Sequence, residues 1–183
     1  MENQILARIE ASIAALANEV ARISARVDAL QGTKGTDRRA QTLQFLDEYR
    51  AAETGGAQAF GAWAASCTID CLRGGLRMIE LREAAHAQLL EARLRELGGV
   101  PTCPTVTEAN REFLETMCSA TVSDVDKLRY FGRIASPEAV IRSLSEKADR
   151  IDDEETQFIV RAIIDDERTT LTFLEQACRQ LAA

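Results

Sequence analysis

The sequence predicts an all-α protein, in which an antiparallel four-helix bundle follows an N-terminal coiled-coil helix. Three observations predict this fold class. The first thirty residues repeat apolar positions in heptads, the remainder divides into long amphipathic segments, and only three prolines and ten glycines interrupt 183 residues. With 46% apolar residues, the composition is that of a globular helical protein. We therefore expect an oligomerisation helix over residues 1–31, a linker over 32–39 and a helical bundle over 40–183.

The N-terminal segment spaces its apolar residues alternately three and four positions apart. This spacing puts them on one seam of a helix, as in a coiled coil. A single helix of this length is marginally stable in water, so it needs partner helices. No later segment repeats the pattern, and we expect a homo-oligomer, with dimer, trimer and tetramer left open; the alternative is that the helix folds back on its own domain. The seam consists of Leu6, Ile9, Ile13, Leu16, Val20, Ile23, Val27 and Leu30.

Two long helices are predicted to form the first hairpin of the bundle. They cover about residues 40–66 and 70–97, and the short turn between them makes them antiparallel neighbours. Thr68 or Asp70 is the expected N-cap of the second helix, because both side chains can accept a hydrogen bond from the first helical turn. The glycine pair at 98–99 predicts its end, with two prolines following shortly after.

The C-terminal half predicts two short helices and a second hairpin. Helical turns are expected over 108–120 and 124–132. The Ser-Pro pair that opens residues 136–150 has the N-cap and N1 residues of a third long helix. Asp152 and Glu155 have the spacing of a capping box for a fourth helix, which should reach residue 181.

Three of the predicted inward-facing stripes carry a glutamate near their middle. These are Glu53, Glu83 and Glu167, and the only histidine of the chain, His86, follows Glu83 by three residues. A buried carboxylate is costly unless it is paired, hydrogen-bonded or bound to a metal. Glu53 and Glu83 each lie 15 residues from Thr68 in the turn, so they should face each other in the hairpin. We expect the three carboxylates to converge.

These residues resemble the ligands of the ferritin-like superfamily of carboxylate-bridged di-iron and di-manganese proteins. That pattern has a glutamate on two helices and a Glu-x-x-His motif on the two others. Glu53 matches the first glutamate, Glu83-Ala-Ala-His86 matches the second-helix motif, and Glu167 matches the fourth-helix motif. The resemblance covers roughly residues 40–181. It implies a non-haem Fe or Mn site of oxidoreductase type that uses these four residues.

Two positions depart from the family pattern. Thr170 stands where the fourth-helix histidine would be; it is a poor ligand for iron and could instead hydrogen-bond a metal-bound water. For the third-helix glutamate, Glu138 lies at a suitable level but in the first turn beside Pro137, outside the apolar stripe. Tyr49, one turn before Glu53, either lines the site or packs in the core.

Two functions therefore remain open on the sequence. One is a metal-dependent oxidoreductase. The other is a non-catalytic assembly or adaptor protein with a protein partner, which keeps the bundle as a scaffold without a metal and pairs the leftover carboxylates with Arg50, Arg82 or Arg168.

Composition narrows the class of partner and the cellular setting. The net charge of −7 argues against nucleic acid or an anionic membrane as the partner. No apolar run is long enough to span a bilayer. The five cysteines include no CxxC pair, so we expect free thiols and a cytoplasmic protein.

Overall fold

The computed structural model describes residues 38–134 and 136–181. The coiled-coil seam and most of the linker lie outside these residues, so the predictions made for them stay predictions. Every regular element in the described part is a helix, which confirms the all-α class. The elements are a helix over residues 38–66, α2 (Asp70–Glu96), α3 (Arg111–Cys118), α4 (Asp124–Ile134), α5 (Pro137–Ala148) and α6 (Glu154–Leu181).

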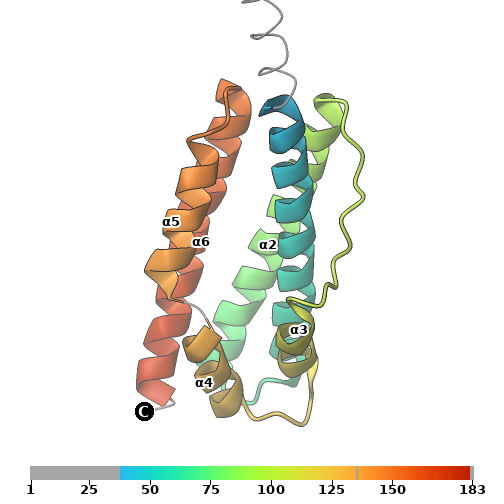
Figure 1. The fold of residues 1–183 in the computed structure, drawn as a ribbon. Coiled ribbons are helices and arrows are strands. Elements are labelled where there is room, and N and C mark those ends of the chain that lie inside the picture. The colour runs from blue at the N-terminus through green and yellow to red at the C-terminus, as the bar shows by residue number, and fades with distance from the viewer. Residues whose placement is uncertain (1–37, 135, 182–183) are drawn as a thin grey trace, which may run out of the picture. The chain divides into compact units, whose positions relative to one another are not determined.

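The long helices run side by side from residue 42 onward (Figure 1). The first helix and α2 are antiparallel, and so are α5 and α6. Residues 97–110 form a long connection that returns along the length of the helices to α3. The short helices α3 and α4 lie at the end that also holds the turn between the first helix and α2. No helix of the described ranges combines the length and apolar character needed to cross a membrane.

The start of α2 differs from the predicted capping. Its N-cap residue is Ile69, which makes no side-chain capping bond. Thr68 instead donates from its backbone nitrogen and its hydroxyl to Asp124 Oδ2, at 3.0 and 2.9 Å, and Asp70 pairs with Arg73 at 2.9 Å. The capping prediction was wrong because α4, far along the chain, supplies a carboxylate that holds the turn.

The end of α2 agrees with the sequence. Gly98 has a φ of 77°, a left-handed conformation that glycine adopts without steric cost. The backbone nitrogen of Gly99 donates to the carbonyl of Leu94 at 2.8 Å, and that of Gly98 donates to Arg95 at 2.9 Å. These bonds satisfy carbonyls of the last turn that have no partner within the helix.

The second hairpin confirms one predicted start and corrects the other. Ser136 is the N-cap of α5 and proline follows at the first helical position, as predicted. At α6 the capping carboxylate belongs to Asp153 rather than to Asp152: Asp153 Oδ2 accepts hydrogen bonds from the backbone nitrogen and the hydroxyl of Thr156. Arg93 of α2 also donates to Asp153, at 2.7 Å, so contact with another helix selects this residue.

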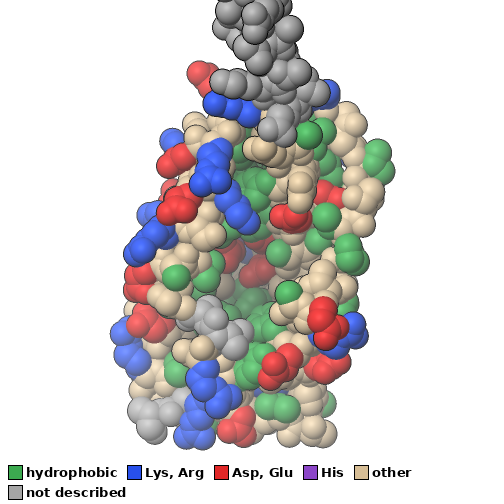
Figure 2. All heavy atoms as spheres, in the orientation of Figure 1, with side chains coloured by type: hydrophobic (Ala, Val, Ile, Leu, Met, Phe, Trp, Pro, Cys, Tyr) green, Lys and Arg blue, Asp and Glu red, His purple; other side chains and the backbone are tan. Residues whose placement is uncertain are grey.

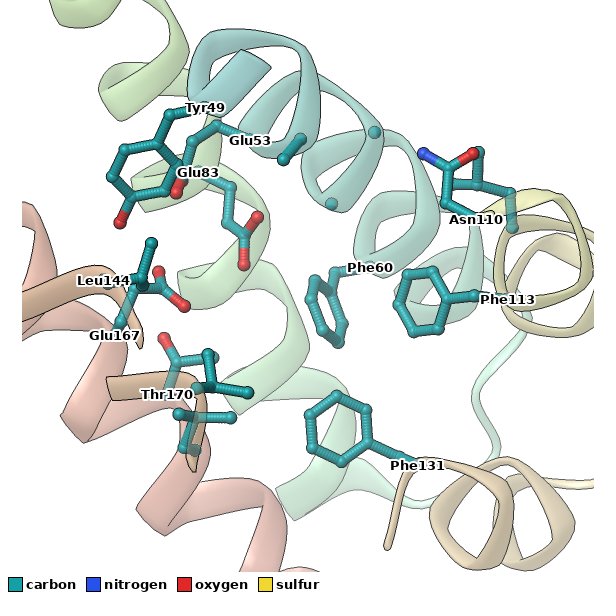
Figure 3. A pocket seen from close by; sticks show the side chains of 16 residues that line it. Tyr49, Glu53, Phe60, Glu83, Asn110, Phe113, Phe131, Leu144, Glu167 and Thr170 are labelled. Carbon is teal, nitrogen blue, oxygen red and sulfur yellow. The ribbon is translucent and has the colours of Figure 1, made fainter. Parts of the chain in front are cut away.

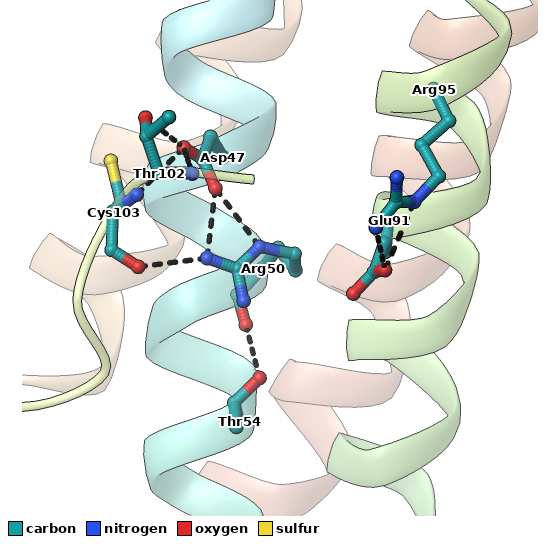
Figure 4. A network of polar contacts seen from close by, with 7 residues as sticks. All are labelled: Asp47, Arg50, Thr54, Glu91, Arg95, Thr102 and Cys103. Carbon is teal, nitrogen blue, oxygen red and sulfur yellow. Dashed lines mark hydrogen bonds and ion pairs between the residues drawn. The ribbon is translucent and has the colours of Figure 1, made fainter. Parts of the chain in front are cut away.

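An aspartate network holds the long connection against the first helix (Figure 4). Asp47, which is 4% exposed, accepts hydrogen bonds from the backbone nitrogens of Thr102 and Cys103 at 2.7 and 2.8 Å. Arg50 donates to Asp47 at 2.9 Å and to the carbonyl of Cys103 at 2.8 Å. Arg50 is therefore engaged with this connection and not with the glutamates at the middle of the helices.

Two hydrophobic clusters fill the interior, one toward each end of the long helices. The cluster nearer the turn at 67–69 is built around Trp63 and Leu76. The cluster at the opposite end is built around Leu46 and Leu90. Between the two clusters the long helices carry polar side chains on the same inner faces.

Candidate metal centre

A layer of ionisable side chains separates the two hydrophobic clusters. Glu53 of the first helix and Glu83 and His86 of α2 are 3%, 7% and 5% exposed. Glu167 of α6 joins them, with a side chain that is 14% exposed. The structure thus brings together the four residues that the sequence predicts to converge (Figure 3 shows the three carboxylates). The regular spacing of apolar residues along each helix is what turns these four side chains inward.

His86 is held between carboxylates through both ring nitrogens. Its Nδ1 lies 3.0 Å from Glu53 Oε2 and 3.9 Å from Glu167 Oε1. Its Nε2 lies 3.1 Å from Oδ2 of Asp166. Asp166 was not among the predicted site residues, because it stands in an acidic run of the kind that usually forms a solvated helix face. Only the packing of α2 against α6 shows that it contacts the histidine.

Burial and mutual repulsion perturb the pKa values of this layer. Burial raises the pKa of Glu53, and His86 offsets part of that rise. Burial together with the charges of Glu53 and Glu167 raises the pKa of Glu83 well above its usual range. Burial and the charge of Glu53 raise the pKa of Glu167 to about 7, and His86 offsets part of that rise. Burial alone would lower the pKa of His86, but Glu53, Asp166 and Glu167 together raise it.

Gly56 makes room for the carboxylate of Glu83. A Cβ atom at position 56 would overlap Oε2 and the carboxyl carbon of Glu83, which lean against the first helix at this point. Gly56 was not among the predicted site residues. An unexplained glycine inside a helix, where it lowers stability, is the signal that could have pointed to it.

Thr170 of α6 stands where the family pattern has its second histidine, and Arg82 of α2 lies beside it. Thr170 is 3% exposed, and its Oγ1 accepts a hydrogen bond from Arg82 Nη2 at 3.0 Å. The charge of Arg82 also lowers the pKa values of Glu83 and Glu167, against the larger effect of burial. Of the three arginines considered from the sequence, Arg82 is the one that adjoins the polar layer, whereas Arg168 pairs with Asp165 at 3.8 Å.

The structure does not bring Glu138 to the polar layer. Its side chain is exposed in the first turn of α5, where its Oε2 accepts a hydrogen bond from the hydroxyl of Ser136 at 2.9 Å. The inner face of α5 instead presents Val140 and Leu144 toward the site. Glu138 stands two residues before Val140, which is about 200° around the helix, so the face that turns Val140 inward leaves Glu138 outside.

Several buried polar atoms of the layer have no hydrogen-bond partner among the described residues. They include Glu167 Oε1 and the hydroxyl of Tyr49. Burial and the nearby charges of Glu53, Glu167 and Glu83 raise the pKa of Tyr49, so its hydroxyl stays protonated. Orphaned buried oxygens are costly, and they indicate that a further group can be accommodated here.

Three of these side chains form a group that could hold a metal ion. Glu53, His86 and Glu167 each offer one ligand atom, and these atoms all lie within 4.8 Å of one another. Carboxylate oxygens with one imidazole nitrogen suit Fe, Mn or Zn. Asp166 at Nε2 matches the carboxylate that commonly orients a metal-binding histidine through its other ring nitrogen.

A cavity of about 350 Å³ adjoins the polar layer. Its walls come from the first helix and from α2 to α6 (Figure 3). Glu53, Glu83 and Glu167 lie at one end of it, and the rings of Phe60 and Phe131 lie toward the other. In Figure 2 the surface is hollowed on this face, with acidic and hydrophobic side chains visible inside.

Comparison of the chain with protein-family models, with curated proteins and with solved structures found no match.

Proposed function

We propose that this protein is a ferritin-like metal protein of oxidoreductase type, which binds an Fe or Mn ion through Glu53, His86 and Glu167. The observation that carries the proposal is the convergence of these three ligand atoms, from three different helices, in the middle of the core. Glu83 completes the wall of the site beside Gly56. Oligomerisation through the N-terminal heptads is part of the same proposal.

The histidine is oriented for this role by its neighbours. With Nε2–H donating to Asp166, the lone pair of Nδ1 faces Glu53 and Glu167. Deprotonation of His86 and the carboxylates would accompany binding of the ion, since ligands bind metals in their deprotonated forms. A redox-active Fe or Mn ion held here would supply electron transfer to dioxygen or peroxide.

Two other residues of the layer can hold protons beside the ligands, Tyr49 and Glu83. The protonated hydroxyl of Tyr49 is a donor beside the carboxylates of Glu53 and Glu167. Glu83 lines the cavity and, with a raised pKa, can hold or release a proton at its carboxyl oxygens. Phe60 and Leu144 contribute apolar walls to the same cavity.

Metal content tests the proposal directly. The purified protein is incubated anaerobically with Fe(II) or Mn(II), desalted, and analysed for bound ions per chain by mass spectrometry. We expect about one ion in the wild type and its loss in His86→Ala and Glu167→Gln. Glu138→Gln is the matched control, because this glutamate is exposed and should leave the ion count unchanged.

Equal metal content in the His86→Ala and Glu138→Gln variants, or none in the wild type, would contradict the proposal. A second candidate would then take its place: a non-catalytic scaffold or adaptor. One observation favours it, since both ring nitrogens of His86 already contact carboxylates and Arg82 already bonds Thr170. Internal ion pairs and hydrogen bonds can hold such a layer together without a metal ion.

A further inference from the structure

We propose that the cavity beside the polar layer binds a small aromatic amine, with its ring among the phenylalanines and its amino group at the glutamates. The cavity measures about 350 Å³, whereas protein interiors are otherwise closely packed. Pockets for small organic ligands start at about 300 Å³, and a cavity of about 150 Å³ already admits benzene. The space therefore suits a ligand of one or two rings with a short side chain.

The apolar wall favours an aromatic ring over an alkyl chain. Phe60 lies at its centre, with the ring of Phe113 at 6.4 Å and an interplanar angle of 71°. Phe131 lies 6.5 Å from Phe60 at an angle of 58°. These tilted rings present both edges and faces, and aromatic pairs in such geometries are favourable beyond their buried area.

The polar end favours a cationic or hydrogen-donating group. Glu53, Glu83 and Glu167 supply carboxyl oxygens there, and these oxygens accept hydrogen bonds from an amino group. Among the other polar groups of the lining, the hydroxyl of Tyr49 lies beside the glutamates, and two groups are engaged elsewhere. Thr170 accepts from Arg82, and Asn110 at the opposite side bonds Thr107 and Thr105 through its amide oxygen and nitrogen. Recognition of the ligand's polar group therefore falls to the glutamates and the hydroxyl of Tyr49.

Ala52 indicates where the cavity meets the solvent. It lines the cavity and is nevertheless exposed on the first helix. A larger side chain at this position would occupy the opening while keeping the helix intact. Binding of the amine rests on the cavity alone; only its role as the substrate of a metal-dependent reaction rests on the proposed function.

Isothermal titration calorimetry on chelator-treated protein tests the inference with matched probes. We expect 2-phenylethylamine to bind at least tenfold more tightly than phenylacetate, which carries a negative group, and more tightly than 2-cyclohexylethylamine, which lacks the aromatic ring. Ala52→Phe should weaken binding of 2-phenylethylamine at least tenfold. Ala65→Phe, on an exposed position of the same helix away from the cavity, should leave it unchanged.

Circular dichroism melting of both variants verifies that they fold. Absence of 2-phenylethylamine binding, equal binding of phenylacetate, or equal effects of the two alanine replacements would overturn the inference. His86→Ala separates the two proposals. If the His86→Ala variant loses the metal ion and still binds the amine, both proposals stand. If the amine binds but neither the wild type nor any variant holds metal, only the proposed function fails.

Discussion

Gly56 and Glu83 lie in contact across the first helical hairpin, and the carboxylate of Glu83 occupies the space where a Cβ atom at position 56 would be. The absent side chain thus sets the position of a buried carboxylate. Gly74, at an open position of α2, has no atom near the corresponding point. The two helical glycines differ in role because only one faces a neighbouring helix.

Gly56→Ala should displace the carboxylate of Glu83 with little change in stability. The displaced atoms are the end of a flexible side chain, and alanine gains about 1 kcal/mol of helix propensity over glycine. We expect metal affinity to fall about 10- to 100-fold, as it does when groups around a metal site are altered. Gly74→Ala is the control and should stabilise the protein by about 0.5–1 kcal/mol without changing affinity. Unaltered metal affinity in Gly56→Ala would contradict a role for Glu83.

The titration of His86 can be followed by NMR without ambiguity, because the chain has a single histidine. Glu53→Gln should lower the pKa of His86 in the metal-free protein, since Glu53 stabilises the imidazolium through a hydrogen bond and its charge. Asp166→Asn should lower the pKa less, because the side chain of Asp166 is 52% exposed and solvent screens its charge. A larger effect from Asp166 would argue against the buried contact to Glu53.

Metal-free protein should lose stability as the pH rises from about 4.5 to about 7. The pKa of Glu167 is raised from 4.5 to about 7 in the folded state. A group with a raised folded pKa contributes stability that is present below its unfolded pKa and lost as the pH rises through its folded pKa. His86, whose pKa is also raised, acts in the same direction. Thermal melts over this range check the prediction, and Glu167→Gln should flatten the profile whereas Glu138→Gln should reproduce the wild type.

Asp47→Asn should destabilise the protein by about 2–3 kcal/mol, because it breaks a buried charge pair and weakens bonds to two backbone nitrogens. Urea denaturation measures the change. Glu91→Gln is the matched control: Glu91 forms a surface pair with Arg95, drawn in the same view (Figure 4), and its loss should cost less than about 0.5 kcal/mol. Equal losses in the two variants would show that Asp47 does not anchor the long connection.

The end of α2 and the start of α5 could be predicted from residues that act within one helical turn. Gly98 ends α2 and the Ser136-Pro137 pair starts α5, as the sequence indicates. The predicted caps at Thr68 and Asp152 failed for a shared reason. Each helix start is decided by a side chain from another helix, Asp124 in one case and Arg93 in the other.

The sequence by itself determined which side chains of the candidate site face inward. Helical periodicity puts Glu53, Glu83, His86 and Glu167 on apolar stripes, and equal distances from the turn put the first two at one level. That information lies within each helix and its hairpin.

Only the tertiary structure decided what these side chains meet. The pairing of His86 with Asp166, the bond of Arg82 to Thr170, the space at Gly56 and the cavity among the phenylalanines all depend on contacts between helices distant in sequence. The same packing leaves Glu138 exposed. Periodicity fixes the direction of a side chain on its own helix, but the distance and angle between helices fix its neighbours.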